Sequence, residues 1–444
     1  MSVSDFEIVV IGGGPAGLCA AIEAQRAGKS VVVLEADEEA GGLTRSFEQD
    51  GYTFDCSGHL LHLSHPDAVS LVEEVTTPED WNRIPRHSVI YLGGTVIPYP
   101  FQQHLAYAPE EIRRECIEEL PTASPPAGTE FANFGEWIHR NLGDGIGRNF
   151  MVPYNEKLST ASVQELTCDW LGRFVPQPSL EEIRRGAAER KEVETGYNRS
   201  FLYPSRHGIA TLSRGLASLV DDLRVNTRVT EIDTEAKQVR TAGGEAFGYE
   251  DGVIATAPLP QLCEMVAPTL AGVEETAKLR ANTVTCVNVG LKQANPEFSQ
   301  YQWIYLSEPQ FAAYRLGFYA RFAETMAPPG RESVYVEIAH DHDAAEGEIV
   351  AAAIADLIRL GTIESEDAVE TVLPVRIEGA YVIHNRDTAP TRALLHEALA
   401  ARSILTAGRY ATWEYSAMED AIVQGLTTTR RLLGVPVEAG SSRA

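Results

Sequence analysis

The stretch that decides the fold is FEIVVIGGGPAGLCAAIEAQRAGKSVVVLE, residues 6–35. An apolar run at 6–11 predicts a strand, residues 16–27 predict a helix that stops at Gly28, and residues 30–34 predict a second strand. A strand, a helix and a second strand in this order form a βαβ unit. The sequence therefore predicts an α/β fold from its first 35 residues.

The glycines between the first strand and the helix follow the pattern GxGxxG. Gly12 allows the tight turn, Gly14 lets a pyrophosphate approach the backbone, and Gly17 lets the helix pack on the strand. Glu35 ends the second strand, where its carboxylate can accept both ribose hydroxyls and disfavours a 2′-phosphate. The pattern predicts FAD or NAD rather than NADP. The residues expected to line this part of the site are Gly12, Gly14, Pro15, Ala16, Gly17, Glu35 and Ala36.

The segment EEAGGLTR, residues 38–45, favours FAD over NAD. It resembles the second fingerprint of glutathione-reductase-type FAD proteins, which include amine oxidases, phytoene desaturases, protoporphyrinogen oxidases and UDP-galactopyranose mutases. The resemblance implies that Gly42, Leu43, Thr44 and Arg45 lie along the FAD phosphates. No second GxGxxG stands in a βαβ setting, so no separate NAD(P)H domain is expected. Electrons would then come from the substrate or from an external reductant that visits the same pocket.

Four further segments, spread over most of the chain, resemble UDP-galactopyranose mutase and its relatives. SGHLLHLS at 57–64 is similar to the histidine loop beside the flavin, and Pro100-Phe101-Gln102 to a Pro-Phe-Asn segment. FMVPYNEKLS at 150–159 is similar to the YTxKQW motif, and GRYATWEYSAME at 408–419 to GRLGTYRYLDMD. The fold implied is a Rossmann-type FAD-binding domain with a helical insert and an antiparallel-sheet substrate domain.

This resemblance implies unusual chemistry. In the mutases, N5 of reduced flavin attacks the anomeric carbon of a nucleotide sugar, and the sugar ring opens and recloses at another hydroxyl without net redox change. The expected function is a ring contraction or rearrangement of a nucleotide-activated sugar, in polysaccharide or glycoconjugate biosynthesis. Two departures, Ser159 for a Trp and Ala417 for an Asp, keep two alternatives open. These are an oxidase or dehydrogenase of the amine oxidase and protoporphyrinogen oxidase type, and a flavin-binding scaffold without activity.

The resemblance also implies roles for single residues. A helix opening at Met418 would point its positive end at the flavin and stabilise negative charge on the reduced ring. Val229 would offer its backbone to the adenine. The further cofactor contacts implied are Gly58, His59, Gly408, Arg409, Met418 and Glu419. His59 and His62 have a plainer interpretation as a hydrogen-bonded structural pair.

The implied catalytic residues are His59, Arg315 and Tyr415, with Arg315 holding the diphosphate. The implied substrate-binding residues are Tyr154, Lys157, Arg173 and Tyr381. Tyr154 and Lys157 stand one helical turn apart and so share a face, but an exposed polar patch would have the same spacing. An arginine is most often a surface ion-pair partner, and Tyr381 could simply pack in the core.

Composition limits the partners. The 444 residues include 63 acidic and 37 basic ones, a formal charge of −26, which disfavours nucleic acid and anionic membrane surfaces. Any anionic substrate therefore needs a local arginine pocket. Six scattered cysteines without a CxxC pair predict neither a metal site nor a disulfide framework. No apolar run is long enough to span a membrane, and a cytoplasmic location is expected.

The sequence also predicts a discontinuous domain organisation, and it leaves the oligomeric state open. The cofactor domain is expected at 1–85, 208–280 and 400–436, the helical insert at 103–195, the substrate sheet at 86–102, 196–207 and 281–399, and a flexible tail at 437–444.

Overall fold

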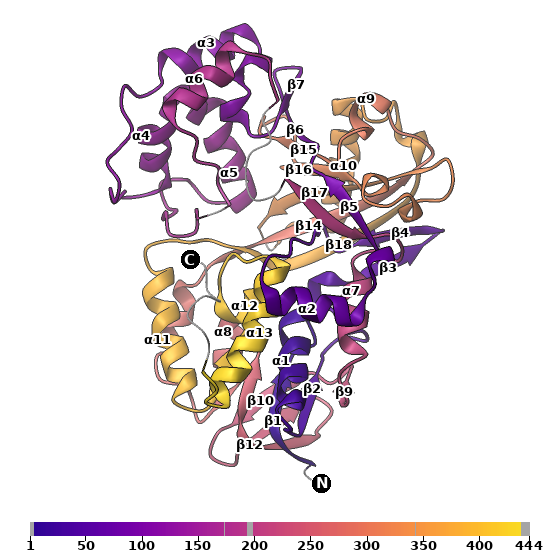
Figure 1. Cartoon of the computed structure of the whole chain (residues 1–444), viewed down its shortest axis with the longest axis vertical. Helices are drawn as coiled ribbons and strands as arrows, with labels where there is room; N and C mark the ends of the chain where they lie inside the picture. Colours follow the sequence, from indigo (N-terminus) through magenta and orange to yellow (C-terminus); the bar gives the residue numbers. More distant parts are fainter. Residues whose placement is uncertain (1–3, 173, 193–198, 342, 437–444) are drawn as a thin grey trace.

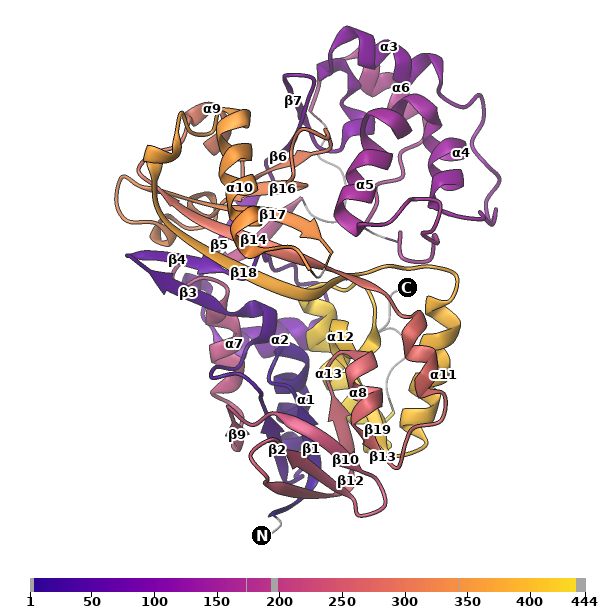
Figure 2. The same ribbon diagram turned by 180° about the vertical axis from the view of Figure 1, so that it is seen from behind.

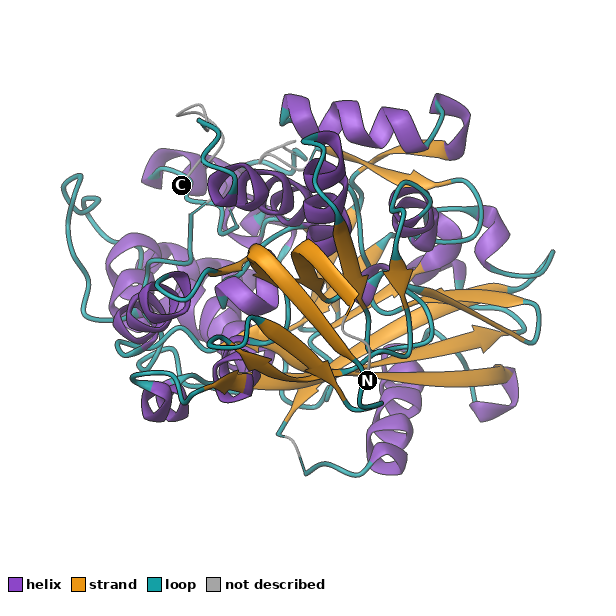
Figure 3. Cartoon of the chain, turned by 90° about the horizontal axis from the view of Figure 1, so that it is seen from below, coloured by secondary structure: helices purple, strands orange, loops and turns teal. Residues whose placement is uncertain are grey.

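A computed structural model describes residues 4–172, 174–192, 199–341 and 343–436 of the chain. Figure 1 shows a lower α/β part that holds the N-terminus, a second sheet above it, and a group of helices beside that second sheet. Figure 2 shows the same arrangement from behind, and Figure 3 shows the strands in the interior with helices around them. The α/β fold with an antiparallel second sheet, predicted from the sequence, is confirmed.

The first sheet is built around β1, which pairs in parallel with both β2 and β12. Its strand order is β13-β10-β11-β12-β1-β2-β9, and β19 pairs with β12. The strands are β1 (Ser4–Ile11), β2 (Val31–Leu34), β9 (Leu223–Arg224), β10 (Val229–Asp233), β11 (Gln238–Thr241), β12 (Ala246–Ala255), β13 (Val266–Ala267) and β19 (Ile404–Thr406). The centre of the sheet thus joins the first, middle and last parts of the chain.

Helices cover both faces of this sheet because side chains alternate along β1. Ile8 and Val10 pack toward α1, while Val9 and Ile11 pack toward α8 and α11. The helices of this part are α1 (Pro15–Arg26), α2 (Pro66–Val75), α7 (Ala210–Ala217), α8 (Leu259–Met265), α11 (Thr388–Ala400), α12 (Gly408–Thr412) and α13 (Met418–Leu432). α13 lies directly on α1, since a Cβ added at Gly425 would come 2.2 Å from the carbonyl oxygen of Ala16.

The second sheet has the order β18-β14-β17-β16-β15-β6-β7, antiparallel except where β15 and β6 run in parallel. Its strands are β6 (Ser88–Leu92), β7 (Thr95–Pro98), β14 (Ala281–Leu291), β15 (Trp303–Leu306), β16 (Arg315–Phe318), β17 (Glu332–His340) and β18 (Val369–Val382). Val334, Val336 and Ile338 pack under α10 (Glu346–Leu360). The alternate residues of β17, Tyr335 and Glu337, therefore face the other way.

The helical group has a core of its own, which includes Phe134, Trp137, Ile146 and Ile183. Its helices are α3 (Glu110–Glu118), α4 (Phe134–Ile146), α5 (Val152–Ser159) and α6 (Leu180–Ala188). The remaining strands form two antiparallel pairs, β3 (Ser46–Gln49) with β4 (Tyr52–Asp55) and β5 (Trp81–Pro85) with β8 (Ser200–Pro204). One short helix, α9 (Pro296–Ser299), completes the α-helices.

Two expected domain limits differ from the structure. β5 was expected in the cofactor domain, but it pairs with β8, a segment expected in the substrate domain. α11 was expected in the substrate domain, but Leu395 and Leu399 pack into the core of the first sheet. Both contacts cross the expected limits because such packing joins residues far apart in sequence. In the described part of the chain, every helix is too short or too polar to cross a bilayer.

Candidate active site

The glycine loop has the geometry that a dinucleotide needs. Gly12 has a φ of 96°, which favours glycine, and a Cβ added at Gly17 would lie 1.9 Å from the carbonyl oxygen of Gly12. A side chain at position 17 would therefore push α1 away from β1. With glycine there, the N-terminus of α1, which includes Pro15 and Ala16, lies close to the end of β1, where its unpaired N–H groups can meet a phosphate.

Glu35 is fixed at the end of β2 and almost fully buried. Its two carboxylate oxygens accept hydrogen bonds from the backbone N–H groups of Gly13, at 2.6 Å, and Asp37, at 2.8 Å. Each oxygen keeps a further lone pair for a ribose hydroxyl. The segment that leads to Val229 lies alongside, because the N–H of Thr227 donates to the carbonyl of Glu35 at 2.7 Å. Ala36 lies between Glu35 and Asp37 in the same turn.

The second glycine pair meets the first. The N–H of Gly41 donates to the carbonyl of Gly13 at 2.8 Å, and a Cβ at Gly42 would lie 3.4 Å from the Cα of Gly14. Leu43 and Thr44 follow in a short 3₁₀ turn. Arg45 donates to the carbonyl of Gly42 at 3.1 Å and pairs with Asp37 at 3.0 Å. Two backbone segments without side chains therefore lie together, as FAD phosphates require.

The last cofactor segment is held against the same loop. A Cβ at Gly408 would lie 2.9 Å from the Cβ of Ala16, and the N–H of Gly408 donates to Gln424 of α13 at 2.8 Å. The carboxylate of Glu419 accepts from the backbone N–H groups of Ser64 and His65, and Met418 packs in the core. Glu419 thus ties the histidine loop to the start of α13. The residues present fit the expected FAD.

His59 lies where the histidine loop crosses the second sheet. A Cβ at Gly58 would lie 2.4 Å from the hydroxyl of Tyr335, so glycine lets the loop approach β17. Burial, together with the charges of Arg409 and Arg315, lowers the pKa of His59 to about 4. His59 is therefore neutral at pH 7. Its Nδ1 is buried and has no hydrogen-bond partner among the described residues, as expected of an atom that faces a bound group. The ring of His62 instead packs edge-on against Phe201.

Arg315 stands on the same face of the second sheet as Glu337, directly opposite it in the register. Its Nε and one terminal nitrogen donate to the two oxygens of Glu337 at 2.5 and 2.8 Å, and Ser57 donates to Glu337 as well. The charge of Arg315 lowers the pKa of the buried Glu337, against the effect of desolvation. This arrangement fixes the guanidinium and leaves its other terminal nitrogen for a ligand.

Arg409 is surrounded by aromatic rings. Its guanidinium lies 5.3 Å from the ring centre of Tyr381 and 5.4 Å from that of Tyr415, and it donates to the carbonyl of Ala380. Tyr381 and Tyr415 stack at 5.7 Å, and Phe174 meets Tyr415 edge-on at 4.4 Å. Tyr381 is half-buried, so core packing does not account for all of its surface.

Tyr154 projects from α5 toward this face. It meets Tyr305 edge-on at 5.4 Å and Tyr314 at 6.4 Å, and Tyr314 meets Tyr381 at 6.3 Å. Burial raises the pKa of Tyr154 and of Tyr314, so both phenols keep their protons at neutral pH. The structure therefore brings together six of the predicted residues: His59, Tyr154, Arg315, Tyr381, Arg409 and Tyr415. Arg409, predicted as a cofactor contact, lies here among the predicted catalytic and substrate-binding residues.

Lys157 does not join them, and its predicted substrate contact stays a prediction. Its ammonium donates to the carbonyls of Leu306, Glu308 and Ala313 at 3.0, 2.8 and 3.3 Å, which occupies all three of its donors. It therefore holds the β15–β16 turn to α5. Burial lowers its pKa to about 8. The predicted role of Arg173 lies outside the described residues.

Sequence reasoning missed Glu337, Tyr305 and Arg86, which line the same face. Glu337 carried a usable signal, since a lone carboxylate in the apolar run VYVEIAH at 334–340 needs a buried partner. Tyr305 and Arg86 carried no such sequence signal, because their positions near the site follow from strand pairing. The described residues hold no cluster of three side chains that could bind a metal.

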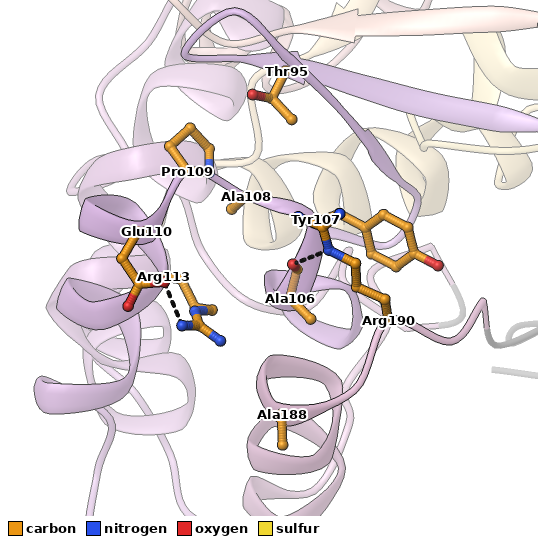
Figure 4. Close-up of a pocket in the computed structure, with 9 residues that line it drawn as sticks. All are labelled: Thr95, Ala106, Tyr107, Ala108, Pro109, Glu110, Arg113, Ala188 and Arg190. Carbon is orange, nitrogen blue, oxygen red and sulfur yellow. Dashed lines mark hydrogen bonds and ion pairs between the residues drawn. The ribbon is translucent and has the colours of Figure 1, made fainter.

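A hollow of about 440 Å³ lies elsewhere, between the helical group and β7. Figure 4 shows that Arg113 and Arg190 line it and bond to Glu110 and to the carbonyl of Ala106. None of the predicted site residues lies in its wall. This hollow is therefore separate from the candidate active site.

Comparisons with known proteins agree with this geometry. Residues 15–433 match the profile of a family described as flavin containing amine oxidoreductase. The probable flavin-containing monoamine oxidase A of Dictyostelium discoideum is 34% identical over 289 residues, 60% of this chain and 58% of that protein. Coproporphyrinogen III oxidase of Propionibacterium freudenreichii subsp. freudenreichii is 28% identical over 201 residues, 41% of this chain and 36% of that protein.

The chain thus spans between about a third and three-fifths of the length of these two curated relatives. A solved structure of reduced UDP-galactopyranose mutase is similar over 98% of this chain and 97% of that chain. Its TM-score is 0.92 and its sequence identity 26%.

Proposed function

The chain belongs to the flavin containing amine oxidoreductase family, and from that premise we propose that it is a mutase-like member that isomerises a nucleotide-activated sugar. The FAD cofactor predicted from the sequence is confirmed by the family and by the reduced mutase structure. The substrate would be a nucleoside diphospho-sugar, and an external reductant would keep the flavin reduced.

One observation carries the proposal: two arginines converge beside a neutral histidine on a face lined with tyrosines. The charges of Arg315 and Arg409 both act on His59, and Tyr381 lies near both guanidinium groups. Arginines bind the oxygens of a diphosphate, and tyrosine hydroxyls can donate to them. An amine substrate is a cation, and a pair of arginines repels it.

Different residues of the chain would bind, orient and hydrogen-bond the ligand. Arg315, fixed by Glu337, would hold the diphosphate without having to become ordered first, and this makes binding stronger. Tyr381 and Tyr415, stacked on each other, would orient the ligand beside Arg409. His59 remains uncharged, so its Nδ1 can donate or accept one hydrogen bond to a bound group. FAD, when bound and reduced, supplies the reacting centre.

The likeness to the reduced mutase structure supports the proposal, because it extends over the helical group as well as both sheets. An oxidase remains the second candidate, because relatives such as the Dictyostelium protein are amine oxidases by name. Ser159 supports it too. Its buried hydroxyl donates its one proton to the carbonyl of Asn155 at 2.7 Å, so the residue that replaces the Trp of the mutase motif has a structural role here.

The test reduces the purified FAD protein with dithionite without oxygen and adds UDP-galactopyranose, UDP-glucose and their furanose isomers in turn. Products are separated by chromatography and the flavin spectrum is recorded. An isomer that forms only with reduced flavin supports the proposal. The same incubation with oxidised flavin is the control.

A second arm adds putrescine and other amines to the oxidised protein in air. Release of hydrogen peroxide with an amine, and no isomer from any nucleotide sugar, would overturn the mutase proposal in favour of the oxidase.

A further inference from the structure

Arg86 lies just before β6, in a nest of aromatic rings next to the candidate site. Its guanidinium carbon lies 4.1 Å from the ring centre of Tyr99 and 5.1 Å from that of Trp303. Its Nε donates to Ser88 at 2.8 Å, and one terminal nitrogen donates to the hydroxyl of Tyr305 at 3.2 Å. These contacts hold the group in one place and use only part of its five donors.

Arg86 has no carboxylate partner among the residues that the structure describes, although the chain carries 63 acidic residues. Trp303 is 6% exposed, and its indole N–H has no acceptor within the same described residues. A buried N–H without an acceptor is costly. A half-buried cation and an unsatisfied donor in contact with it both call for an oxygen-rich anion.

Strand register connects this place to the candidate site. Tyr305 stands directly opposite Arg315 on the neighbouring strand, and it also receives the hydrogen bond from Arg86. The ring of Tyr305 meets Tyr154 at 5.4 Å and Tyr99 at 5.2 Å. Arg86, Tyr305 and Arg315 are all half-buried, and Tyr305 connects the two arginines through its hydrogen bond from Arg86 and its place opposite Arg315.

We propose that Arg86 and the indole N–H of Trp303 form a second oxyanion subsite of the active site. Together with Arg315 it selects a substrate that carries two separated sets of anionic oxygens. The nature of this ligand rests on the proposed function. The shared chemistry is an oxyanion, and its source is either the diphosphate or a carboxylate on the sugar, as in a nucleotide-activated uronic acid.

The test measures equilibrium binding to the oxidised FAD protein by isothermal titration calorimetry, so it does not depend on turnover. The probes are UDP, UDP-galactose and UDP-galacturonic acid. We expect R86Q to weaken binding about 10- to 100-fold, the loss of one charge-assisted pair. If the diphosphate fills the subsite, R86Q should bind all three probes more weakly. If a sugar carboxylate fills it, R86Q should bind only UDP-galacturonic acid more weakly.

R86K keeps the charge and should recover part of the affinity, whereas a purely packing role would not separate R86K from R86Q. W303F removes the N–H and should weaken the same probes by a smaller factor, about threefold. R83Q, at an exposed arginine on β5, is the matched control and should bind as the wild type does. Equal affinity of R86Q and wild type for every probe would overturn the subsite.

If no nucleotide binds the wild-type protein, the proposed function fails. Inorganic pyrophosphate then decides the subsite alone. Weaker pyrophosphate binding by R86Q than by R83Q would support the proposed subsite, and equal binding by the two variants would overturn it.

Discussion

A substitution that removes the charge of Arg315 would leave the buried carboxylate of Glu337 unpaired. R315A should therefore lower the free energy of unfolding by about 3–5 kcal/mol, besides weakening nucleotide binding. R315K keeps a charge next to Glu337 but loses the fork that binds two oxygens at once. We expect R315K to melt near the wild type and to bind UDP about tenfold more weakly.

Thermal melts and UDP titrations of both variants check this prediction. The double variant R315A/E337Q removes both charges and should recover most of the stability lost in R315A, but not the binding. UDP affinity unchanged in R315K would mean that the guanidinium does not hold the nucleotide.

His384 should make the stability of the protein depend on pH. Burial, with the charges of Arg392 and Arg409 and against that of Asp169, lowers its pKa from 6.5 to about 4. Between these values the unfolded chain binds a proton that the folded chain does not, so stability falls as the pH falls from 6.5 toward 4. At pH 5 this one group costs about 2 kcal/mol relative to pH 7.5.

H384Q should therefore reduce the drop in melting temperature between pH 7.5 and pH 5. The carbonyl of His384, which accepts from Thr167, is kept in this variant. H87Q, at an exposed histidine, is the control and should leave the drop unchanged. An equal drop in H384Q and wild type would contradict the assignment.

At the scale of elements, the packing of α13 on α1 depends on Gly425. A Cβ there would lie 2.2 Å from a backbone carbonyl, so G425A must separate the two helices. We expect it to lower stability by about 1–3 kcal/mol and to weaken FAD binding, since α1 follows the glycine loop. Melting temperature and the FAD retained after gel filtration measure both effects.

The matched control is Gly347, in the exposed first turn of α10, where an added Cβ meets nothing within 4 Å. G347A should be neutral or stabilise the protein by up to about 1 kcal/mol, because alanine favours helix. Equal melting of G425A and G347A would show that the close helix contact is not needed.

The sequence predicted those elements whose signals are local. The glycine loop, Glu35 and the helix opening at Met418 needed only neighbouring residues to be recognised. The pairing of β5 with β8 and the place of α11 depend on contacts between distant segments, and no local pattern encodes them. The place of Lys157 depends on distant contacts too, since its three carbonyl partners lie about 150 residues away in sequence.

At the scale of the whole molecule, FAD would join segments from both ends and the middle of the chain. A ligand that binds only the folded state stabilises it by mass action, by about 4 kcal/mol at a 1,000-fold excess over Kd. Removing FAD should therefore lower the melting temperature, and adding it back should raise that temperature with the logarithm of FAD concentration. Differential scanning calorimetry measures this, with NAD as the control ligand that should cause no shift.

The active-site face could be predicted only in part, because some of its residues are brought there by contacts between distant segments. Resemblance placed His59, Arg315 and Tyr415 on it residue by residue. Arg86 and Tyr305 reach it because β6 and β15 pair in parallel, and that pairing brings together segments about 215 residues apart.

The position of β1 between β2 and β12 also has a consequence for biosynthesis. As the ribosome releases the chain, β1 has no partner on one edge until residue 255 has emerged, and the part of α1 that contacts α13 stays uncovered until α13 is complete at residue 432. The glycine loop is thus among the first segments made, while the helix that packs against it is among the last. The nascent chain therefore leaves the part of α1 that α13 covers exposed for almost the whole of translation.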